Sequence, residues 1–201
     1  VSIAKTSGFC MGVRRAVDLV LHAANKYSHP IYTFGPLIHN PQFLSLLAEK
    51  NISLMETVPS SGTGTVLIRA HGVPPDVYDQ LETAGFHVID ATCPKVKRVQ
   101  ILIEKNVKKG CAAIILGNKH HAEVIGLLGY AGDKGHTVTS LDELKALPAF
   151  DKAIVVAQTT QDVSLFEDIK EWLRQNHPHY RIINTICPAT KNRQMEAEQL
   201  S

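Results

Sequence analysis

The chain has 201 residues, 44% of them hydrophobic and 20% charged, which is ordinary for a globular protein of one or two α/β domains. Its 21 basic and 19 acidic residues give a net charge of +2, and the basic residues are dispersed, which argues against a nucleic-acid partner. No apolar run approaches the roughly 18 residues of a transmembrane helix, and no secretory signal is visible.

Four cysteines are spread along the chain, and none forms a Cys-x-x-Cys pair. Without a signal peptide, they indicate a reducing compartment in which thiols serve chemistry rather than disulfides. Taken singly, a cysteine is more often an inert core residue. Cys111 fits that interpretation, because it begins the apolar run of KKGCAAIILG, so we expect it to be buried.

A repeat with a period of roughly 80 to 95 residues relates the other three cysteines. Cys10 lies in FCMGVRR, Cys93 in TCPKVKR and Cys187 in ICPATKN. Each cysteine follows a β-branched run, and prolines at 94 and 188 suit the first turn of a helix. We therefore predict each cysteine at a strand-to-helix turn, where free N–H groups and the helix dipole favour a thiolate.

The first repeat begins with a helix after Cys10, because apolar residues recur there at helical spacing. The strand IYTF follows, then GPLIHNP with His39. A second strand in TVLIRAHGVPPD precedes His71, and the next helix is predicted to end at Gly85.

The second repeat follows the same order after Cys93. A helix leads to the strand AAIIL and to GNKHHAE, which places His121 four residues after a glycine, as GPLIHNP places His39. SLDE at 140–143 predicts a capping box, and KAIVVAQTTQD predicts a strand that ends before Thr159 and Thr160.

Alternating strands and helices predict parallel sheets, in which ligands bind beyond the carboxyl ends of the strands. The fold class is therefore α/β. The residues that we expect at this edge are Cys10, His39, His71, Cys93, His121, Thr159 and Cys187.

Three thiolates with a vacant fourth position fit either zinc or an iron–sulfur cluster, and the residues alone do not decide between these metals. A redox sensor and a phosphate-binding module with structural cysteines remain alternatives to an enzyme. The three histidines would add donors to helix N-termini that already suit phosphate. Glu123 is either a general acid whose pKa is raised by partial burial or a first-turn glutamate favoured by the helix dipole.

Taken together, GFCMGVRRAV, GPLIHNP, RAHGV, DATCPKV, HHAEVIG, AQTTQ and ICPATKNRQ resemble the LytB-type family of 4-hydroxy-3-methylbut-2-enyl diphosphate reductases. The match runs in order along essentially the whole chain. The resemblance implies a pseudo-threefold trefoil of α/β domains around a central 4Fe–4S cluster with one open iron. It assigns the three cluster ligands to Cys10, Cys93 and Cys187.

The resemblance also implies the remaining roles. The substrate diphosphate would lie among His39, His71, His121 and Thr159, and Glu123 would be the proton donor. Thr159 and His121 would join Glu123 as catalytic residues. The allylic hydroxyl would leave as water, giving isopentenyl and dimethylallyl diphosphates in the non-mevalonate pathway. Ferredoxin or flavodoxin would supply the electrons, and the location would be the cytoplasm, or the plastid stroma if a leader is missing.

The chain departs from the family pattern at its end. The family continues into a full third domain that completes the diphosphate pocket, whereas this sequence stops at Ser201. We therefore expect domains at 1–91 and 92–185, with only the start of a third at 186–201. A chain of this extent is expected to carry a partial anion site and a cluster that is exposed on one side.

Overall fold

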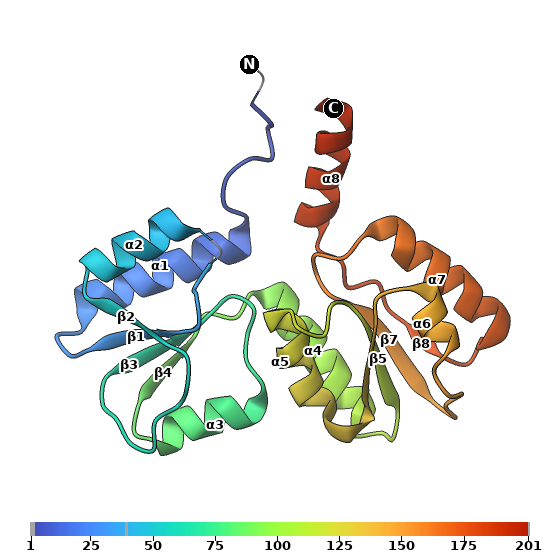
Figure 1. The fold of residues 1–201 in the computed structure, drawn as a ribbon, viewed down its shortest axis with the longest axis horizontal. Coiled ribbons are helices and arrows are strands. Elements are labelled where there is room, and N and C mark those ends of the chain that lie inside the picture. Colours follow the sequence, from blue (N-terminus) through green and yellow to red (C-terminus); the bar gives the residue numbers. More distant parts are fainter. Residues whose placement is uncertain (1–2, 39, 201) are drawn as a thin grey trace. The chain divides into compact units, whose positions relative to one another are not determined.

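The computed structural model describes residues 3–38 and 40–200, which form two units that are each built on a four-stranded parallel sheet (Figure 1). One unit comprises residues 9–97, and the other comprises residues 1–8 with 98–201. The predicted α/β class with parallel sheets is confirmed. The predicted domain ranges stay a prediction.

The unit of residues 9–97 has the strand order β2-β1-β3-β4, with every neighbouring pair parallel. Its elements are α1 (Met11–Lys26), β1 (Ile31–Phe34), α2 (Pro41–Glu49), β2 (Ile52–Met55), β3 (Thr65–Ile68), α3 (Pro75–Thr83), β4 (His87–Asp90) and the first turn of α4 (Pro94–Val107). Helices α1 and α2 cover one face of the sheet and α3 covers the other (Figure 1). Helix α1 is held by a stripe of small and branched side chains, because Ala16, Val20 and Ala23 recur at helical spacing and are fully buried.

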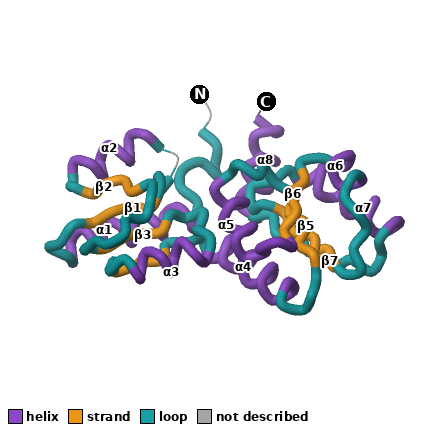
Figure 2. The backbone as a smooth tube through the Cα atoms, turned by 60° about the horizontal axis from the view of Figure 1, so that its bottom comes forward, coloured by secondary structure: helices purple, strands orange, loops and turns teal. Residues whose placement is uncertain are grey.

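The other unit repeats this topology with the strand order β6-β5-β7-β8. Its elements are the rest of α4, β5 (Ala112–Leu116), α5 (Ala122–Ala131), the 3₁₀ turn η1 (Gly132–Lys134), β6 (Gly135–Val138), α6 (Leu141–Lys145), β7 (Ala153–Ala157), α7 (Val163–Asn176), β8 (Arg181–Ile182) and α8 (Pro188–Leu200). Helices α4 and α5 pack on one face, and α6 and α7 on the other, so β5 and β7 are buried along their whole length (Figure 2).

Local signals in the sequence explain where several elements begin and end. In the predicted capping box, the Ser140 hydroxyl accepts a hydrogen bond from the Glu143 amide at 3.2 Å. Gly85 follows α3 with φ of 98°, a left-handed conformation that ends a helix at little cost only for glycine. Within residues 3–38 and 40–200, no helix has the length and apolar character needed to cross a membrane.

Candidate active site

Three of the predicted site residues, His71, His121 and Thr159, follow the carboxyl ends of central strands. Strand order reverses between β1 and β3 in one unit and between β5 and β7 in the other. In open parallel sheets this reversal opens a crevice in which ligands bind. His71 follows β3, while His121 and Thr159 follow β5 and β7. His39 lies outside the residues that the structure describes.

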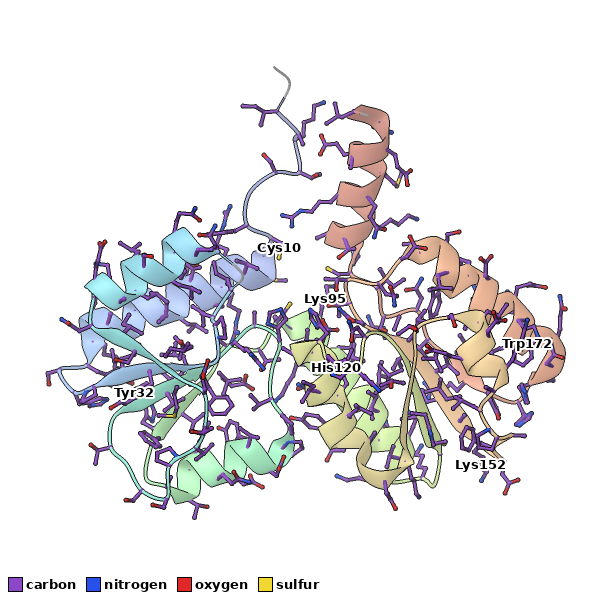
Figure 3. All side chains as sticks on the ribbon, in the orientation of Figure 1. Cys10, Tyr32, Lys95, His120, Lys152 and Trp172 are labelled. Atoms are coloured by element: carbon purple, nitrogen blue, oxygen red, sulfur yellow. The ribbon has the colours of Figure 1, made fainter. Side chains whose placement is uncertain are left out.

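Each of the three motif cysteines directly precedes a helix, as predicted. The predicted strand-to-helix turn is confirmed for Cys93, after β4, and Cys187, after β8, but residues 3–9 before Cys10 form no strand. Cys10 is the N-cap of α1 (Figure 3), Cys93 precedes α4, and Cys187 precedes α8. All three are partly exposed free thiols. The amides of Cys93 and Cys187 donate to the carbonyls of Ala70 and Thr159 at 2.9 and 2.8 Å. Each acceptor lies two residues beyond a strand, Ala70 after β3 and Thr159 after β7. The two units therefore share this hydrogen bond as well as the motif.

Within the unit of residues 9–97, helix α1 lies directly against Cys93. A Cβ atom added to Gly12 would lie 2.5 Å from the Cys93 sulfur, closer than real side chains approach. Glycine at this position therefore lets the N-terminus of α1, with Cys10 as its cap, come into contact with the second cysteine. The sequence placed Cys10 and Cys93 in equivalent motifs, and the fold of this unit brings their segments together.

A polar network holds the loop that carries Cys93. Arg15 donates from its guanidinium to the carbonyls of Thr92 and Asp90 at 3.2 and 3.3 Å. The Asp90 carboxylate accepts from the Thr92 amide at 2.9 Å and from the Lys97 ammonium at 3.0 Å. Burial acts to raise the pKa of Asp90, but these hydrogen bonds and the lysine charge hold it below its usual value. The loop before the cysteine is thus fixed on both sides.

In the other unit, Glu123 and Thr159 form a buried pair. Only 1% of Glu123 and 6% of Thr159 is exposed. One carboxylate oxygen of Glu123 accepts from the Thr159 amide at 2.6 Å, and the other lies 2.7 Å from the Thr159 hydroxyl. A glutamate that only interacts favourably with the helix dipole can remain in solvent at the first turn of a surface helix. The helix dipole alone therefore does not explain why Glu123 is buried.

Burial raises the pKa of Glu123 above its ordinary value, although the two hydrogen bonds from Thr159 oppose the shift. A raised pKa keeps a proton on the carboxyl at a pH where an exposed glutamate has lost it. In the neutral acid the carboxyl O–H can donate to the Thr159 hydroxyl, whose own hydrogen is then directed elsewhere. The pair can therefore hold a proton and pass it on through one hydroxyl.

His121 is the N-cap of α5, the helix that carries Glu123. Its Nδ1 atom accepts from the Glu123 amide at 3.1 Å. A neutral ring that accepts at Nδ1 carries its hydrogen on Nε2. The preceding turn is shaped by Asn118, whose side-chain oxygen accepts from the amide of His120, the exposed residue before the cap (Figure 3).

The Glu123 titration predicts a pH dependence of stability. Since folding raises this pKa above the ordinary value of 4.5, the folded chain binds the proton more tightly than the unfolded chain. The resulting stabilisation is fully present below the unfolded pKa and is lost as the pH rises through the folded pKa. We expect the free energy of unfolding of the unaltered chain to fall, relative to Glu123→Gln, as the pH is raised above 4.5. Urea denaturation across a pH series measures this, and a constant difference would contradict it.

Arg69, a residue to which the sequence assigned no role, also lies at a crevice edge. It directly follows β3, and a Cβ on Gly35, the residue after β1, would overlap its guanidinium. Its Nε is buried without a hydrogen-bond partner, and burial lowers the pKa of the guanidinium. The equivalent residue of the other unit, Gln158, packs on Gly117 and is hydrogen-bonded to the Asn118 amide and the Thr160 hydroxyl.

The proposed metal ligands are divided between the two units. Cys10 and Cys93 belong to residues 9–97, whereas Cys187 belongs to the other unit. Among residues 3–38 and 40–200, no three histidine, cysteine, aspartate or glutamate side chains are clustered closely enough to form a metal site. The donor set nevertheless fits an iron–sulfur cluster, because all three are accessible thiols at helix N-termini, where a thiolate is favoured.

Cys111 differs from its prediction. It lies just before β5 and is partly exposed, whereas the sequence predicted a buried residue. The apolar run that suggested burial begins at Ala112, and the chain reaches Cys111 from the turn at Gly110. It is not the first residue before a helix, so it lacks the feature that the other three cysteines share.

The whole chain, residues 1–201, matches a family model described as LytB protein. It is 40% identical to a protein of Alkaliphilus oremlandii, covering all of this chain and 72% of that protein. It is 42% identical to a protein of Nitratidesulfovibrio vulgaris, covering 98% of this chain and 72% of the relative. Both relatives are named 4-hydroxy-3-methylbut-2-enyl diphosphate reductase.

Two solved structures are similar over most of the chain. One, described as (E)-4-hydroxy-3-methyl-but-2-enyl diphosphate reductase, the terminal enzyme of the non-mevalonate pathway, gives a TM-score of 0.86 at 36% identity and covers 100% of this chain and 72% of its own. The other, the corresponding reductase from Plasmodium falciparum, gives a TM-score of 0.87 at 30% identity and covers 94% of this chain and 61% of its own.

Proposed function

The chain belongs to the LytB protein family, and from that premise we propose that it is part of an iron–sulfur reductase that removes the allylic hydroxyl of 4-hydroxy-3-methylbut-2-enyl diphosphate. The products would be isopentenyl and dimethylallyl diphosphates. Both curated relatives described above carry the name of this reductase. The proposed cofactor, residue roles and electron donor are those that the resemblance to the family implies, and the site chemistry described above supports the role of Glu123.

The observation that carries the proposal is the Glu123–Thr159 pair. It combines a buried carboxyl of raised pKa with a hydroxyl 2.7 Å away. The Thr159 carbonyl accepts from the Cys187 amide, so a hydrogen bond joins the loop of Thr159 to the loop that carries a proposed cluster ligand. A proton source beside a redox centre is what reductive loss of a hydroxyl requires.

The reaction balances as a reduction with two electrons and two protons. The allylic C–O bond breaks, one proton leaves with the hydroxyl as water, and the other forms the new C–H bond. Cys10, Cys93 and Cys187 would hold the cluster, which would deliver the donor's electrons and provide a Lewis-acidic iron. Glu123, when protonated, would supply the first proton through the Thr159 hydroxyl, which lies 2.7 Å from one of its carboxyl oxygens, and the Thr159 amide holds the other oxygen in place.

The diphosphate does no chemistry in this scheme, but its binding energy positions the reacting carbon. We assign this role to His39, His71, His121 and Thr159, with the N-terminus of α5 contributing its free N–H groups. His121 can donate from Nε2, because its Nδ1 accepts from the Glu123 amide. A ferredoxin or flavodoxin is the proposed electron donor.

The test is to reconstitute the chain without oxygen, to measure iron and acid-labile sulfide, and to follow conversion of the substrate with a chemically reduced donor. We expect about four irons and four sulfides per chain, as in a cubane cluster, and formation of both products. Binding of zinc in place of iron would contradict the proposal, as would a loaded cluster that gives no product. Of these two outcomes, the first would favour a structural metal site and the second a redox sensor.

A further inference from the structure

The N-terminal segment runs beside helix α8 (Figures 1 and 2), although nearly the whole chain separates them in sequence. Two charged residues of α8 hold it. The Glu196 carboxylate accepts from the amides of Lys5 and Thr6 at 2.6 and 2.8 Å, and also from the Thr6 hydroxyl. The Arg193 guanidinium donates to the carbonyls of Thr6 and Gly8 at 3.1 and 2.6 Å.

We call these two side chains, together with residues 5–8, the clasp. Its five hydrogen bonds all involve an ionised side chain, and such bonds are stronger than neutral ones. The carboxylate binds the N–H groups of the segment and the guanidinium binds its carbonyls, so the backbone is held on both of its polar edges. The hydrogen bonds hold the pKa of Glu196 below its ordinary value, consistent with an ionised carboxylate.

The clasp does not contribute to the apolar core. Helix α8 has no buried residue, and its apolar positions do not form a stripe. What orders the helix at its N-terminal end is polar: the Cys187 amide and the Thr190 hydroxyl both donate to the Thr159 carbonyl, at 2.8 and 3.2 Å. Since packing does not explain Arg193 and Glu196, their contacts point to another role.

Both ends of the clasp lie close in sequence to a motif cysteine. Gly8, whose carbonyl Arg193 binds, is two residues before Cys10, so the clasped backbone lies within about 7 Å of that residue along the chain. Helix α8 starts directly after Cys187. The clasp therefore connects the segment that leads into the first cysteine to the helix that follows the third.

We propose that Arg193 and Glu196 are positioning residues that fix the segment leading into Cys10 and the helix following Cys187, so that these cysteines retain the iron–sulfur cluster. The proposal rests on the proposed function, because it requires that these cysteines bind a cluster. Residues that orient metal ligands typically change metal retention by about 10- to 100-fold when they are replaced. In the proposal, Arg193 and Glu196 act on the cysteines indirectly, through their hydrogen bonds to the backbone of residues 5–8.

The experiment compares Arg193→Gln, Glu196→Gln and Arg193→Lys with the unaltered chain after anaerobic loading. The controls are Arg174→Gln and Asp168→Asn, which remove the same charges from exposed positions of α7. Three quantities are measured: the rate of iron loss to a chelator, the hydrogen exchange of the Lys5 and Thr6 amides, and the thermal midpoint of the apo-chain.

We expect both glutamine variants to lose iron about tenfold faster than the unaltered chain, with an unchanged apo midpoint and faster exchange at Lys5 and Thr6. Arg193→Lys should be intermediate, because lysine keeps the charge but not the two-pronged donor. The controls should behave like the unaltered chain.

The clasp proposal is overturned if exchange rises in the glutamine variants while iron loss stays at the control rate. It is also overturned if iron loss merely follows a fall in the apo midpoint. Tyr180→Phe calibrates that second outcome, because it removes the hydroxyl that accepts from the Phe150 amide, and Tyr180 belongs to the apolar core and not to the clasp. If the unaltered chain takes up no iron, the proposed function itself fails and the clasp proposal fails with it.

Discussion

Replacing Glu123 by glutamine should lower turnover by about 10²- to 10⁴-fold, the usual contribution of a general acid, while leaving the iron content unchanged. Glutamine matches glutamate in size and can still accept from the Thr159 amide and donate to its hydroxyl. It therefore preserves the geometry and removes only the transferable proton. Turnover and iron content, measured on the same sample, test both parts.

Glu143→Gln is the matched control, because Glu143 is also a first-turn glutamate of the same unit but is exposed. It should keep full turnover. Unchanged activity in Glu123→Gln would show that the proton comes from another group, such as water held at the site. Loss of iron in Glu123→Gln would instead mean that the residue maintains the Thr159 loop that binds the Cys187 amide.

The second large effect is expected for Cys93→Ser, which should abolish stable iron binding and, with it, turnover. Serine is nearly isosteric, but its hydroxyl does not provide the thiolate that an iron–sulfur cluster requires. The surrounding loop should remain folded, because Arg15, Asp90 and the Ala70 carbonyl hold it through other groups. Iron and sulfide content and the visible absorption of the anaerobic protein measure the loss.

Cys111→Ser provides the internal comparison, since Cys111 is also a partly exposed free thiol but does not precede a helix. This variant should bind iron as the unaltered chain does. If both variants keep the full iron content, Cys93 is not a ligand and the proposed ligand set is wrong. If both variants lose iron to the same extent, iron binding does not distinguish the motif cysteines from Cys111.

Much of the fold could be predicted because its signals are local. β-Branched runs indicated most of the strands, although the run before Cys10 forms none in residues 3–9, and the SLDE capping box indicated the start of α6. Prolines after Cys93 and Cys187 indicated the first turns of α4 and α8. The alternation of these elements determined the parallel sheets, and thereby the edge at which the motif residues lie.

The site was predicted only as a set of candidates. The repeat identified which cysteines belong together, because each of those three directly precedes a helix, whereas Cys111 precedes a strand. Spacing left two interpretations of Glu123, since a first-turn glutamate looks the same in sequence whether it is solvated or buried. The prediction of a buried Cys111 was wrong, because an apolar run does not specify which of its end residues enters the core.

By itself, the sequence determined the class of fold, the repeat and the family, because each depends on the order of residues along the chain. The tertiary structure decided the burial of Glu123 against Thr159, the approach of α1 to Cys93 through Gly12, and the clasp between Arg193 and the N-terminal segment. In the chain, Glu123 and Thr159 are 36 positions apart, Gly12 and Cys93 are 81 apart, and Thr6 and Arg193 are 187 apart. Contacts over such separations depend on how the sheets and helices pack, and no periodicity or local motif encodes them.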